Sequence, residues 1–363
     1  MFSTVKLLLS PKNRAVMRTF RAEAKQRGMS FVEFVDSITP EEQAALLARA
    51  LPAPDMARWG MAPRDQLVAE GGSGSPAVDA AVAAAKKGDW TPAAEMMVES
   101  YGDWDLRARV VSSLAEVAAD DDGWLTAWRA ARPDDRHVAV VDAEALLLLA
   151  WQLRGSLLAK ETRSDQFAGF RRVLPQAAEA ATRAAEALPD DPTPWLTLVT
   201  AARGLGYDHA RFAPLWQGVV DRAPLHRAAH DSALQYWCAK WRGSHERMFA
   251  FAEQAAAKSP SLSVLMLHAA HEFDEQTVWR QPNIQHALDT TLRWLDGDGA
   301  DSLRARDDLG YAAMALVNSG RAAEAVPLFR KLGTYAGGSP WDYYASPVLT
   351  FDDYRVKACK AAR

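Results

Sequence analysis

Five of the eight histidines in this chain lie between positions 226 and 271. His226 and His230 are four residues apart, and His268 and His271 are three apart, so each pair lies on one face of a helix. Glu272 follows directly. Imidazole and carboxylate groups at these spacings can bind a transition metal. The four paired histidines are therefore candidate metal ligands.

The same histidines also have a structural interpretation, as polar side chains that face a groove or as imidazoles bonded to neighbouring backbone. The segment from His268 to Glu272 lacks the zinc-protease pattern, which has two histidines four residues apart and a glutamate between them. We favour the structural interpretation and expect no cofactor.

A second group of chemistry-bearing residues lies in the same region. Trp237 and Trp241 are four residues apart, which predicts that their rings stack along one helical face with Lys240 beside them. Gly243 would allow a tight turn with a positive φ angle, and Ser244 can cap the helix that follows. The tryptophans either pack a helical hairpin, which we favour, or face a ligand. The candidate binding site consists of Trp237, Lys240, Trp241, His245, His268 and Glu272.

Two acidic stretches resemble cation sites but have simpler interpretations. Asp120, Asp121 and Asp122 would complement the dipole at a helix N-terminus, and we favour that role over a divalent-cation site. Residues 296–301 alternate Asp and Gly but lack the spaced ligands and the terminal glutamate of an EF-hand, so we expect a solvated turn.

Proline-containing turns recur in the middle of the chain at nearly constant spacing. Pro192 and Pro224 are 32 residues apart, Pro224 and Pro260 are 36 apart, and amphipathic helical sequence fills both intervals. A period of about 34 residues with two helices per unit is typical of helical-hairpin solenoids, whose units stack because none can bury its apolar face alone. The sequence therefore predicts an all-α fold, a tetratricopeptide-like α-solenoid of antiparallel helical hairpins, with almost no β-strand.

Changes in composition divide the chain into four predicted parts. These are a small helical N-terminal region (1–70), a flexible Gly- and Ser-rich linker (71–76), the helical-repeat solenoid (77–335) and an aromatic-rich C-terminal cap (336–363). The linker is either natural or an artificial junction between two pieces. The C-terminal aromatic residues either cap the final hairpin, which we favour, or dock on another subunit.

Local signals fix several predicted boundaries. Thr39 is expected to cap a helix that begins at Pro40, and Thr91 to cap one that opens at Pro92. Residues 160–175 are expected to form an irregular or longer insertion between units.

Charge and cysteine usage exclude several classes of partner and compartment. The 363 residues carry a formal net charge of -4, which gives no field that would attract nucleic acid or anionic lipid, so we expect neither partner. Cys238 and Cys359 have no metal-ligand spacing and indicate a reducing compartment. The apolar N-terminal run is too short for a secretory signal, and no segment reaches the roughly 18 apolar residues that span a bilayer. We expect a cytoplasmic protein.

Two groups of residues resemble known helical-repeat families. The first resembles a tetratricopeptide repeat and comprises Ala312, Leu316, Gly320, Ala323, Ala325 and Phe329, with a partial copy at Ala80, Gly88, Trp90 and Ala94. The second comprises Trp237, the stretch 240–246 with its Trp-x-Gly-Ser-His motif, and residues 248–252.

The second group is similar to an uncharacterised bacterial family of helical-repeat proteins that has a Trp-Gly-Gly-Ser-type step before a helix with Met and Phe-Ala. This chain departs from that pattern at Arg242, which precedes the single Gly243. Over residues 76–335 the resemblance implies an all-helical domain of unknown function.

Two hypotheses about function follow. The first is a non-catalytic scaffold that binds a protein or peptide on the concave face of the helical array. The second is an enzyme or a metal- or small-molecule-binding protein that uses the His and Trp residues of region 226–272. We favour the scaffold.

Overall fold

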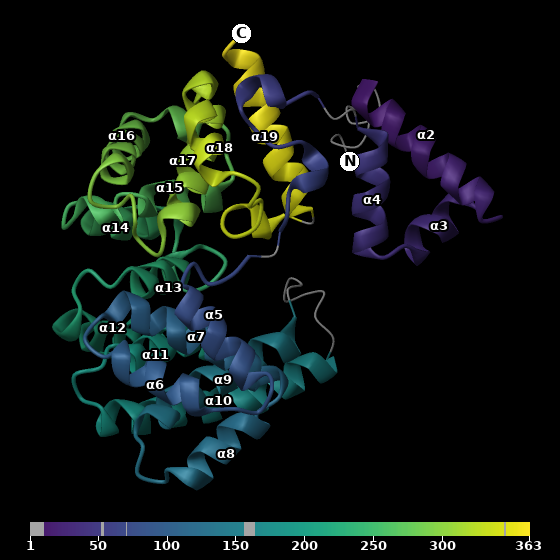
Figure 1. The fold of residues 1–363 in the computed structure, drawn as a ribbon. Coiled ribbons are helices and arrows are strands. Elements are labelled where there is room, and N and C mark those ends of the chain that lie inside the picture. The colour runs from purple at the N-terminus through teal and green to yellow at the C-terminus, as the bar shows by residue number, and fades with distance from the viewer. Residues whose placement is uncertain (1–10, 52–53, 70, 156–163, 345) are drawn as a thin grey trace. The chain divides into compact units, whose positions relative to one another are not determined.

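The computed structural model describes residues 11–51, 54–69, 71–155, 164–344 and 346–363 (Figure 1). These residues form 18 α-helices and contain no strand, apart from an isolated bridge between Val68 and Tyr335. The prediction of an all-α fold is confirmed. No helix within the described ranges is long and apolar enough to cross a membrane. The apolar N-terminal run and the first part of the predicted insertion lie outside these ranges.

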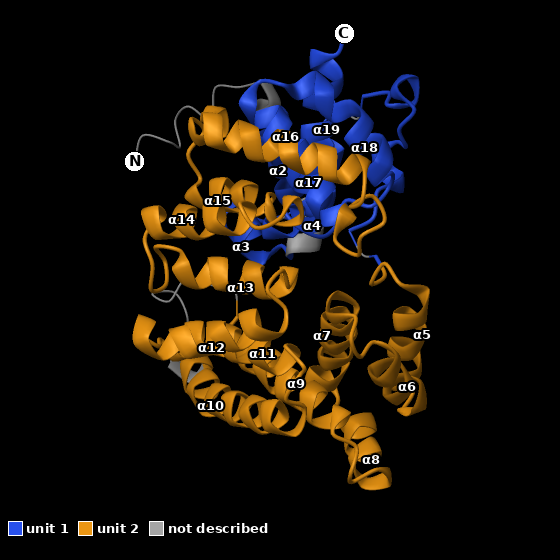
Figure 2. Cartoon of the chain, turned by 90° about the vertical axis from the view of Figure 1, so that its left-hand side faces the viewer, with its two compact units in different colours: residues 1–71, 306–363 blue, residues 72–305 orange. Residues whose placement is uncertain are grey.

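The chain folds into two compact units, which Figure 2 shows in different colours. Unit 1 combines residues 1–71 with residues 306–363, and unit 2 comprises residues 72–305. Unit 1 thus combines described residues from the N-terminal and the C-terminal parts of the sequence. The predicted boundaries of the helical-repeat region, after position 76 and at position 335, stay predictions.

The described residues of unit 2 form twelve α-helices. They are α5 (Pro76–Ala85), α6 (Thr91–Glu99), α7 (Trp104–Asp120), α8 (Gly123–Ala131), α9 (His137–Arg154), α10 (Ser164–Ala187), α11 (Thr193–Leu205), α12 (His209–Arg222), α13 (Arg227–Trp237), α14 (His245–Ala256), α15 (Leu265–Phe273) and α16 (Pro282–Asp296).

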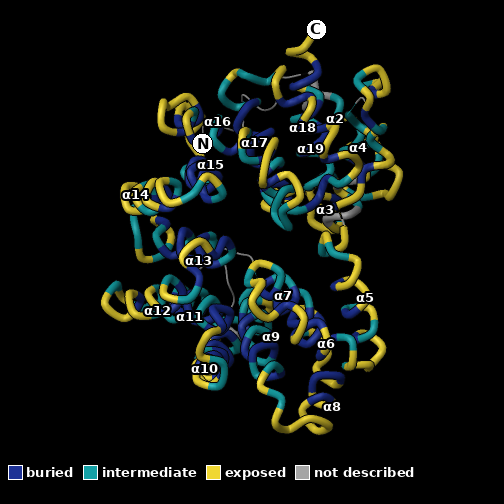
Figure 3. Tube along the Cα trace, turned by 60° about the vertical axis from the view of Figure 1, so that its left-hand side comes forward, coloured by how far each residue is buried: buried dark blue, intermediate teal, exposed yellow. Residues whose placement is uncertain are grey.

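Helices α9 to α16 pack as successive pairs of sequence neighbours. Each of α9, α11, α13 and α15 packs against the helix that follows it, and these four helices also pack one against the next. We call these four helices the α9–α15 row. In Figure 2 helices α9 to α16 lie in successive layers of unit 2, and Figure 3 shows buried residues along the whole stack.

Polar side chains link neighbouring helices of the α9–α15 row. The Thr197 hydroxyl in α11 donates to the Glu144 carboxylate in α9 at 2.6 Å, and the hydroxyls of Thr200 in α11 and Ser232 in α13 are 2.7 Å apart. Burial raises the pKa of the Glu144 carboxyl, although the Thr197 hydrogen bond opposes the rise. These bonds pair polar groups that the contacts between helices remove from water.

A buried ion pair fixes α7 to the rest of unit 2. The Arg107 Nε donates to the Asp191 carboxylate at 2.5 Å, and its Nη1 donates to the Met97 carbonyl at 2.6 Å. The third nitrogen, Nη2, lies 3.0 Å from His137 Nδ1. Both charged side chains are fully buried. Paired and hydrogen-bonded in this way, the two charges are tolerated in the interior.

Unit 1 begins with a small three-helix cluster and contains three helices from the C-terminal part of the chain. Its helices are α2 (Pro11–Gln26), α3 (Phe31–Ser37), α4 (Pro40–Ala50), α17 (Ala305–Ser319), α18 (Val326–Leu332) and α19 (Pro347–Ala361). Phe20, Phe34 and Leu46 form the core of the first three. Thr39 caps α4 as predicted, and Glu42 completes a capping box.

The segment after α4 is attached to α19 by one buried carboxylate. The Asp352 carboxylate accepts from Arg64 Nε at 2.5 Å and from Arg355 Nε at 2.7 Å. Arg64 also donates to the Leu51 carbonyl at 2.9 Å, and Arg355 donates to the Ala62 carbonyl at 2.7 Å. Side chains from the two ends of the sequence thus share one charge network.

The aromatic residues of the C-terminal part pack on the last helices of unit 1. Trp341 and Phe351 are buried, with ring centroids 5.4 Å apart, and both contact the Phe329 ring of α18. Tyr343 and Tyr344 are exposed.

The structure corrects two predicted helix boundaries. Residues 164–175 are not an irregular insertion but the first half of α10, which contains Pro175 and packs along α9. Packing over this length outweighs the cost of a proline inside a helix. Thr91 is the first residue of α6 and not its cap. The Asp89 carboxylate accepts from the Thr91 backbone instead, at 3.0 Å.

The structure also shows the conformation of the two acidic stretches, residues 120–122 and 296–301. Asp120 ends α7, so only Asp121 and Asp122 precede α8, and the Asp121 carboxylate accepts from the Gly123 backbone at 3.0 Å. The prediction that all three aspartates start a helix was wrong for Asp120. Of the predicted turn at 296–301, residues 297–301 form turns, whereas Asp296 is the last residue of α16.

Candidate functional site

His226 is the N-cap residue of α13. Its Nδ1 accepts from the Ala229 backbone at 3.1 Å, and its Nε2 donates to the Trp104 carbonyl in α7 at 3.2 Å. Burial lowers the pKa of His226, which agrees with a neutral ring whose two nitrogens are both engaged. This predicted metal candidate therefore ties α13 to α7 within unit 2.

His230 is a core residue. Its Nδ1 donates to the His226 carbonyl at 3.0 Å, and its ring lies edge-on to Trp216 at 4.9 Å. The Nε2 atom is buried and has no hydrogen-bond partner among the described residues. Burial lowers the pKa of His230 to about 4. The ring is held neutral inside an aromatic cluster that also contains Phe251.

His268 belongs to a closed triad with Arg227 and Asp231. Asp231 accepts from Arg227 Nε at 3.1 Å, and the same carboxylate oxygen lies 3.3 Å from His268 Nδ1. His268 Nε2 lies 3.3 Å from Arg227 Nη2. Because a guanidinium only donates, Nε2 is the acceptor and the proton of the neutral ring is on Nδ1.

The pKa values of the triad agree with this assignment. Burial lowers the pKa of His268 to about 3, although Asp231 opposes the shift. Burial raises the pKa of Asp231, but Arg227, His268 and Arg304 together outweigh it and lower the net value. The triad is an Arg–Asp ion pair with a neutral imidazole, and His268 has no lone pair directed to a substrate.

Acidification is expected to destabilise the protein through His230 and His268. Both folded-state pKa values lie below the ordinary value of 6.5, so the unfolded chain takes up these protons first as the pH falls. The stabilisation is complete above about pH 6.5 and is lost toward pH 4 for His230 and toward pH 3 for His268, at about 1.4 kcal/mol per pH unit for each histidine. Urea unfolding at pH 7, 6 and 5 measures this loss.

The variant His230→Phe serves as the control for acidification. Phenylalanine keeps an aromatic ring at this position and does not titrate. The slope of the free energy of unfolding against pH should therefore decrease by the contribution of one histidine. If the free energy of unfolding of this variant depends on pH as strongly as that of the wild type, the assignment of a neutral, buried His230 is contradicted.

Lys240 and Glu272 form an ion pair, which brings together two residues of the predicted binding site. The Lys240 ammonium lies 2.7 Å from the Glu272 carboxylate, which also accepts from Gln235 at 3.4 Å. The pair joins the turn after α13 to the C-terminal end of α15. His271, next to Glu272, is half-buried, and burial lowers its pKa.

The prediction that Trp237 and Trp241 stack on one helical face was wrong. Helix α13 ends at Trp237, so Trp241 lies in the following turn and not one helical turn further along the same face. Trp237 stacks on His209 at 4.8 Å. Trp241 instead lies edge-on to Trp151 of α9, with ring centroids 5.8 Å apart.

Gly243 is required for a different reason from the one predicted. Its φ angle is not positive, but a Cβ atom at this position would lie 1.6 Å from the Trp237 carbonyl oxygen. Ser244 caps α14 as predicted by accepting from the Arg247 backbone at 3.2 Å. His245 is exposed and contacts Phe273 of α15 edge-on at 4.7 Å.

Trp241 is the centre of a mixed aromatic and basic cluster. The guanidinium of Arg154 lies 5.7 Å from the Trp241 ring centroid and 5.6 Å from that of Trp151. The guanidinium of Arg203 lies 5.4 Å and 4.9 Å from the same two rings. We call Trp151, Arg154, Arg203 and Trp241 the Trp241 cluster. All four side chains are partly exposed.

Sequence reasoning missed three members of this cluster. Arg154 and Arg203 lie in the last turns of α9 and α11, where a basic residue complements the helix dipole. Arg-Gly steps occur at positions 154–155, 203–204 and 242–243, and also at 27–28 in unit 1, so this signal alone does not single out the cluster. The order of the helices brings the three steps of unit 2 to one edge of the α9–α15 row.

The described residues contain no group of three or more His, Cys, Asp or Glu side chains that could hold a metal ion. The Cys238 thiol is buried, and burial together with Glu272 raises its pKa to about 12. It donates to the Leu234 carbonyl at 3.4 Å. The thiol is thus unsuited to act as a nucleophile near neutral pH.

Comparison with known proteins identifies no relative of this chain. No model of a known protein family matches the sequence, and no similar curated protein is found. The resemblance to helical-repeat families therefore rests on the residues quoted above, and the all-α fold is the part of it that the structure supports.

Proposed function

We propose that this protein is a non-catalytic scaffold that binds a protein or peptide partner, with helices α9 to α16 acting as a tetratricopeptide-like solenoid. The packing of each helix of the α9–α15 row against the next supports this proposal, because such a row offers an extended surface for an elongated partner.

The Trp241 cluster is the observation that carries the proposal. It presents two partly exposed indoles and two guanidinium groups from α9, α11 and the turn after α13. Tryptophan and arginine are the residue types that most often dominate the binding energy of protein interfaces. The surface around Trp241 is thus the best candidate contact region of the chain.

The charges near Trp241 favour an acidic partner. Lys240 and Arg242 flank Trp241 in sequence, and Arg154 and Arg203 lie over its ring. Glu272 is a carboxylate in this region, and it is paired with Lys240. An acidic segment with an aromatic side chain would match these groups in charge and in stacking surface.

The groups that a catalytic function would need argue against the enzyme hypothesis. His268 has both ring nitrogens engaged within its triad, and Cys238 has a raised pKa and a backbone partner. General-base and nucleophilic catalysis both require a group that can reach a substrate.

Replacing Trp241 by alanine is expected to weaken binding of an amidated, Glu-rich peptide that contains one Tyr by about thirtyfold, the loss of a typical interface hot spot. Arg154→Gln should weaken it by about fivefold, since the cation is partly exposed. Fluorescence anisotropy with the labelled peptide, and with its Gln-rich counterpart, measures both effects.

Trp90→Ala is the matched control for this experiment. Trp90 is also half-buried and has a guanidinium over its ring, that of Arg132 at 4.9 Å, but it lies next to α6. Its replacement should leave peptide affinity unchanged. Two outcomes would refute the proposal even if Trp241→Ala failed to fold. One is that the Glu-rich peptide binds the wild type and Arg154→Gln with equal affinity. The other is that the wild type binds the Glu-rich peptide no more tightly than the Gln-rich peptide.

A further inference from the structure

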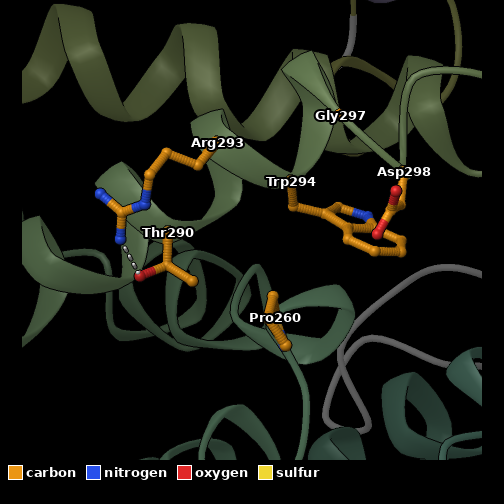
Figure 4. A pocket seen from close by; sticks show the side chains of 6 residues that line it. All are labelled: Pro260, Thr290, Arg293, Trp294, Gly297 and Asp298. Carbon is orange, nitrogen blue, oxygen red and sulfur yellow. Dashed lines mark hydrogen bonds between the residues drawn. The ribbon is translucent and has the colours of Figure 1, made fainter.

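A pocket of about 360 Å³ lies on unit 2 where the end of α16 meets the short 3-10 helix Pro260–Leu262 (Figure 4). Its volume falls within the range of sites for small molecules. None of its residues belongs to the Trp241 cluster or to the predicted His and Trp site. The lining residues are Pro260, Thr290, Arg293, Trp294, Gly297 and Asp298.

The turn after α16 determines the geometry of this pocket. The backbone nitrogens of Gly297 and Gly299 both donate to the Trp294 carbonyl, at 3.1 Å and 2.9 Å. A Cβ atom at position 299 would lie 2.2 Å from Trp294 Nε1, so the indole lies against backbone that only glycine permits. The turn thus holds the Trp294 ring and carries Asp298 beside it.

The pocket has a basic group on one side and an acidic group on the other. In Figure 4 the Arg293 side chain extends away from Trp294, while the Asp298 carboxylate lies beside the indole. The Arg293 Nη2 donates to the Thr290 hydroxyl at 3.0 Å, which orients the guanidinium. In the same view the Trp294 indole and the Pro260 ring lie between the two charged side chains.

We propose that this pocket binds a small zwitterion whose carboxylate pairs with Arg293 and whose amine lies over Trp294 next to Asp298. A guanidinium recognises a carboxylate through paired N–H donors. A cation over an indole face gains from the ring quadrupole, and a neighbouring carboxylate adds to that attraction. The carbon chain between the two charges contacts Trp294 and Pro260. This site is independent of the proposed scaffold surface.

Three small molecules, titrated into the full-length protein, test the contributions of the ligand's carboxylate and ammonium separately. Nα-acetyl-lysine carries the carboxylate and the ammonium, its methyl amide carries only the ammonium, and Nα-acetyl-norleucine carries only the carboxylate. The indole N–H resonance of Trp294, assigned with the variant Trp294→Phe, reports binding in nitrogen-15 NMR spectra. We expect Nα-acetyl-lysine to bind at least about fivefold more tightly than either singly charged probe.

Two variants test the role of each charge. Arg293→Gln should remove the advantage of Nα-acetyl-lysine over its methyl amide. Asp298→Asn should reduce its advantage over Nα-acetyl-norleucine, since the attraction of the ammonium to the Trp294 ring remains. Equal affinity for all three probes, no shift of the Trp294 resonance with any of them, or affinity ratios in both variants equal to those of the wild type would overturn the proposal.

Discussion

Replacing Asp191 by alanine is expected to lower the free energy of unfolding by about 3–5 kcal/mol, because it leaves the buried Arg107 guanidinium without its counter-charge. The bonds of Arg107 to the Met97 carbonyl and to His137 would remain, but neither partner carries a negative charge. Urea unfolding followed by far-ultraviolet circular dichroism measures the loss.

The exposed pair Arg129–Asp142 is the matched control for Asp191. Its charged atoms are 2.7 Å apart, but the two side chains are 46% and 38% exposed, so Asp142→Ala should cost at most about 1 kcal/mol. The double replacement Arg107→Met with Asp191→Ala should cost less than the sum of its parts, because it removes both charges. If Asp191→Ala costs no more than Asp142→Ala, the buried pair does not fix α7.

Replacing Asp352 by alanine is expected to destabilise unit 1 by about 3–5 kcal/mol. The substitution leaves the guanidiniums of Arg64 and Arg355 facing each other without the carboxylate that both bind. Since this carboxylate attaches residues 54–69 to α19, that segment should also become more sensitive to limited proteolysis. Urea unfolding and mapping of the first cleavage sites measure the two effects.

Asp353→Ala is the control at the neighbouring position. Asp353 pairs with Lys357 at 2.8 Å, and both side chains are well exposed, so its loss should cost at most about 1 kcal/mol. Equal proteolysis of residues 54–69 in the two variants would show that Asp352 does not hold this segment.

Local sequence signals predicted most helices and several of their ends. Thr39 and Ser244 cap the helices that follow them, because capping depends on a side chain three residues from its backbone partner. Predictions failed where a contact outside the expected local pattern decides the structure. Pro175 lies inside a helix because α10 packs along α9, and Gly243 is needed because the Trp237 carbonyl lies close to it.

The candidate site was predicted only in part. Lys240 and Glu272 were both named from the sequence, but their ion pair spans 32 residues and follows from the packing of α13 and α15 in the row. Trp151 was missed because nothing near position 241 in the sequence indicates that α9 ends beside it. Its place follows from the stacking of α9, α11 and α13.

The sequence by itself determined the all-α class, the approximate positions of the helices and the residues that cap them, because hydrophobic periodicity, proline and capping side chains act over a few residues. Only the tertiary structure decided which helices share a unit and which charges pair. Arg107 and Asp191 are 84 residues apart, and Arg64 and Asp352 are 288 apart. Such pairs join residues that come together only in the folded structure, so no local pattern in the sequence indicates them.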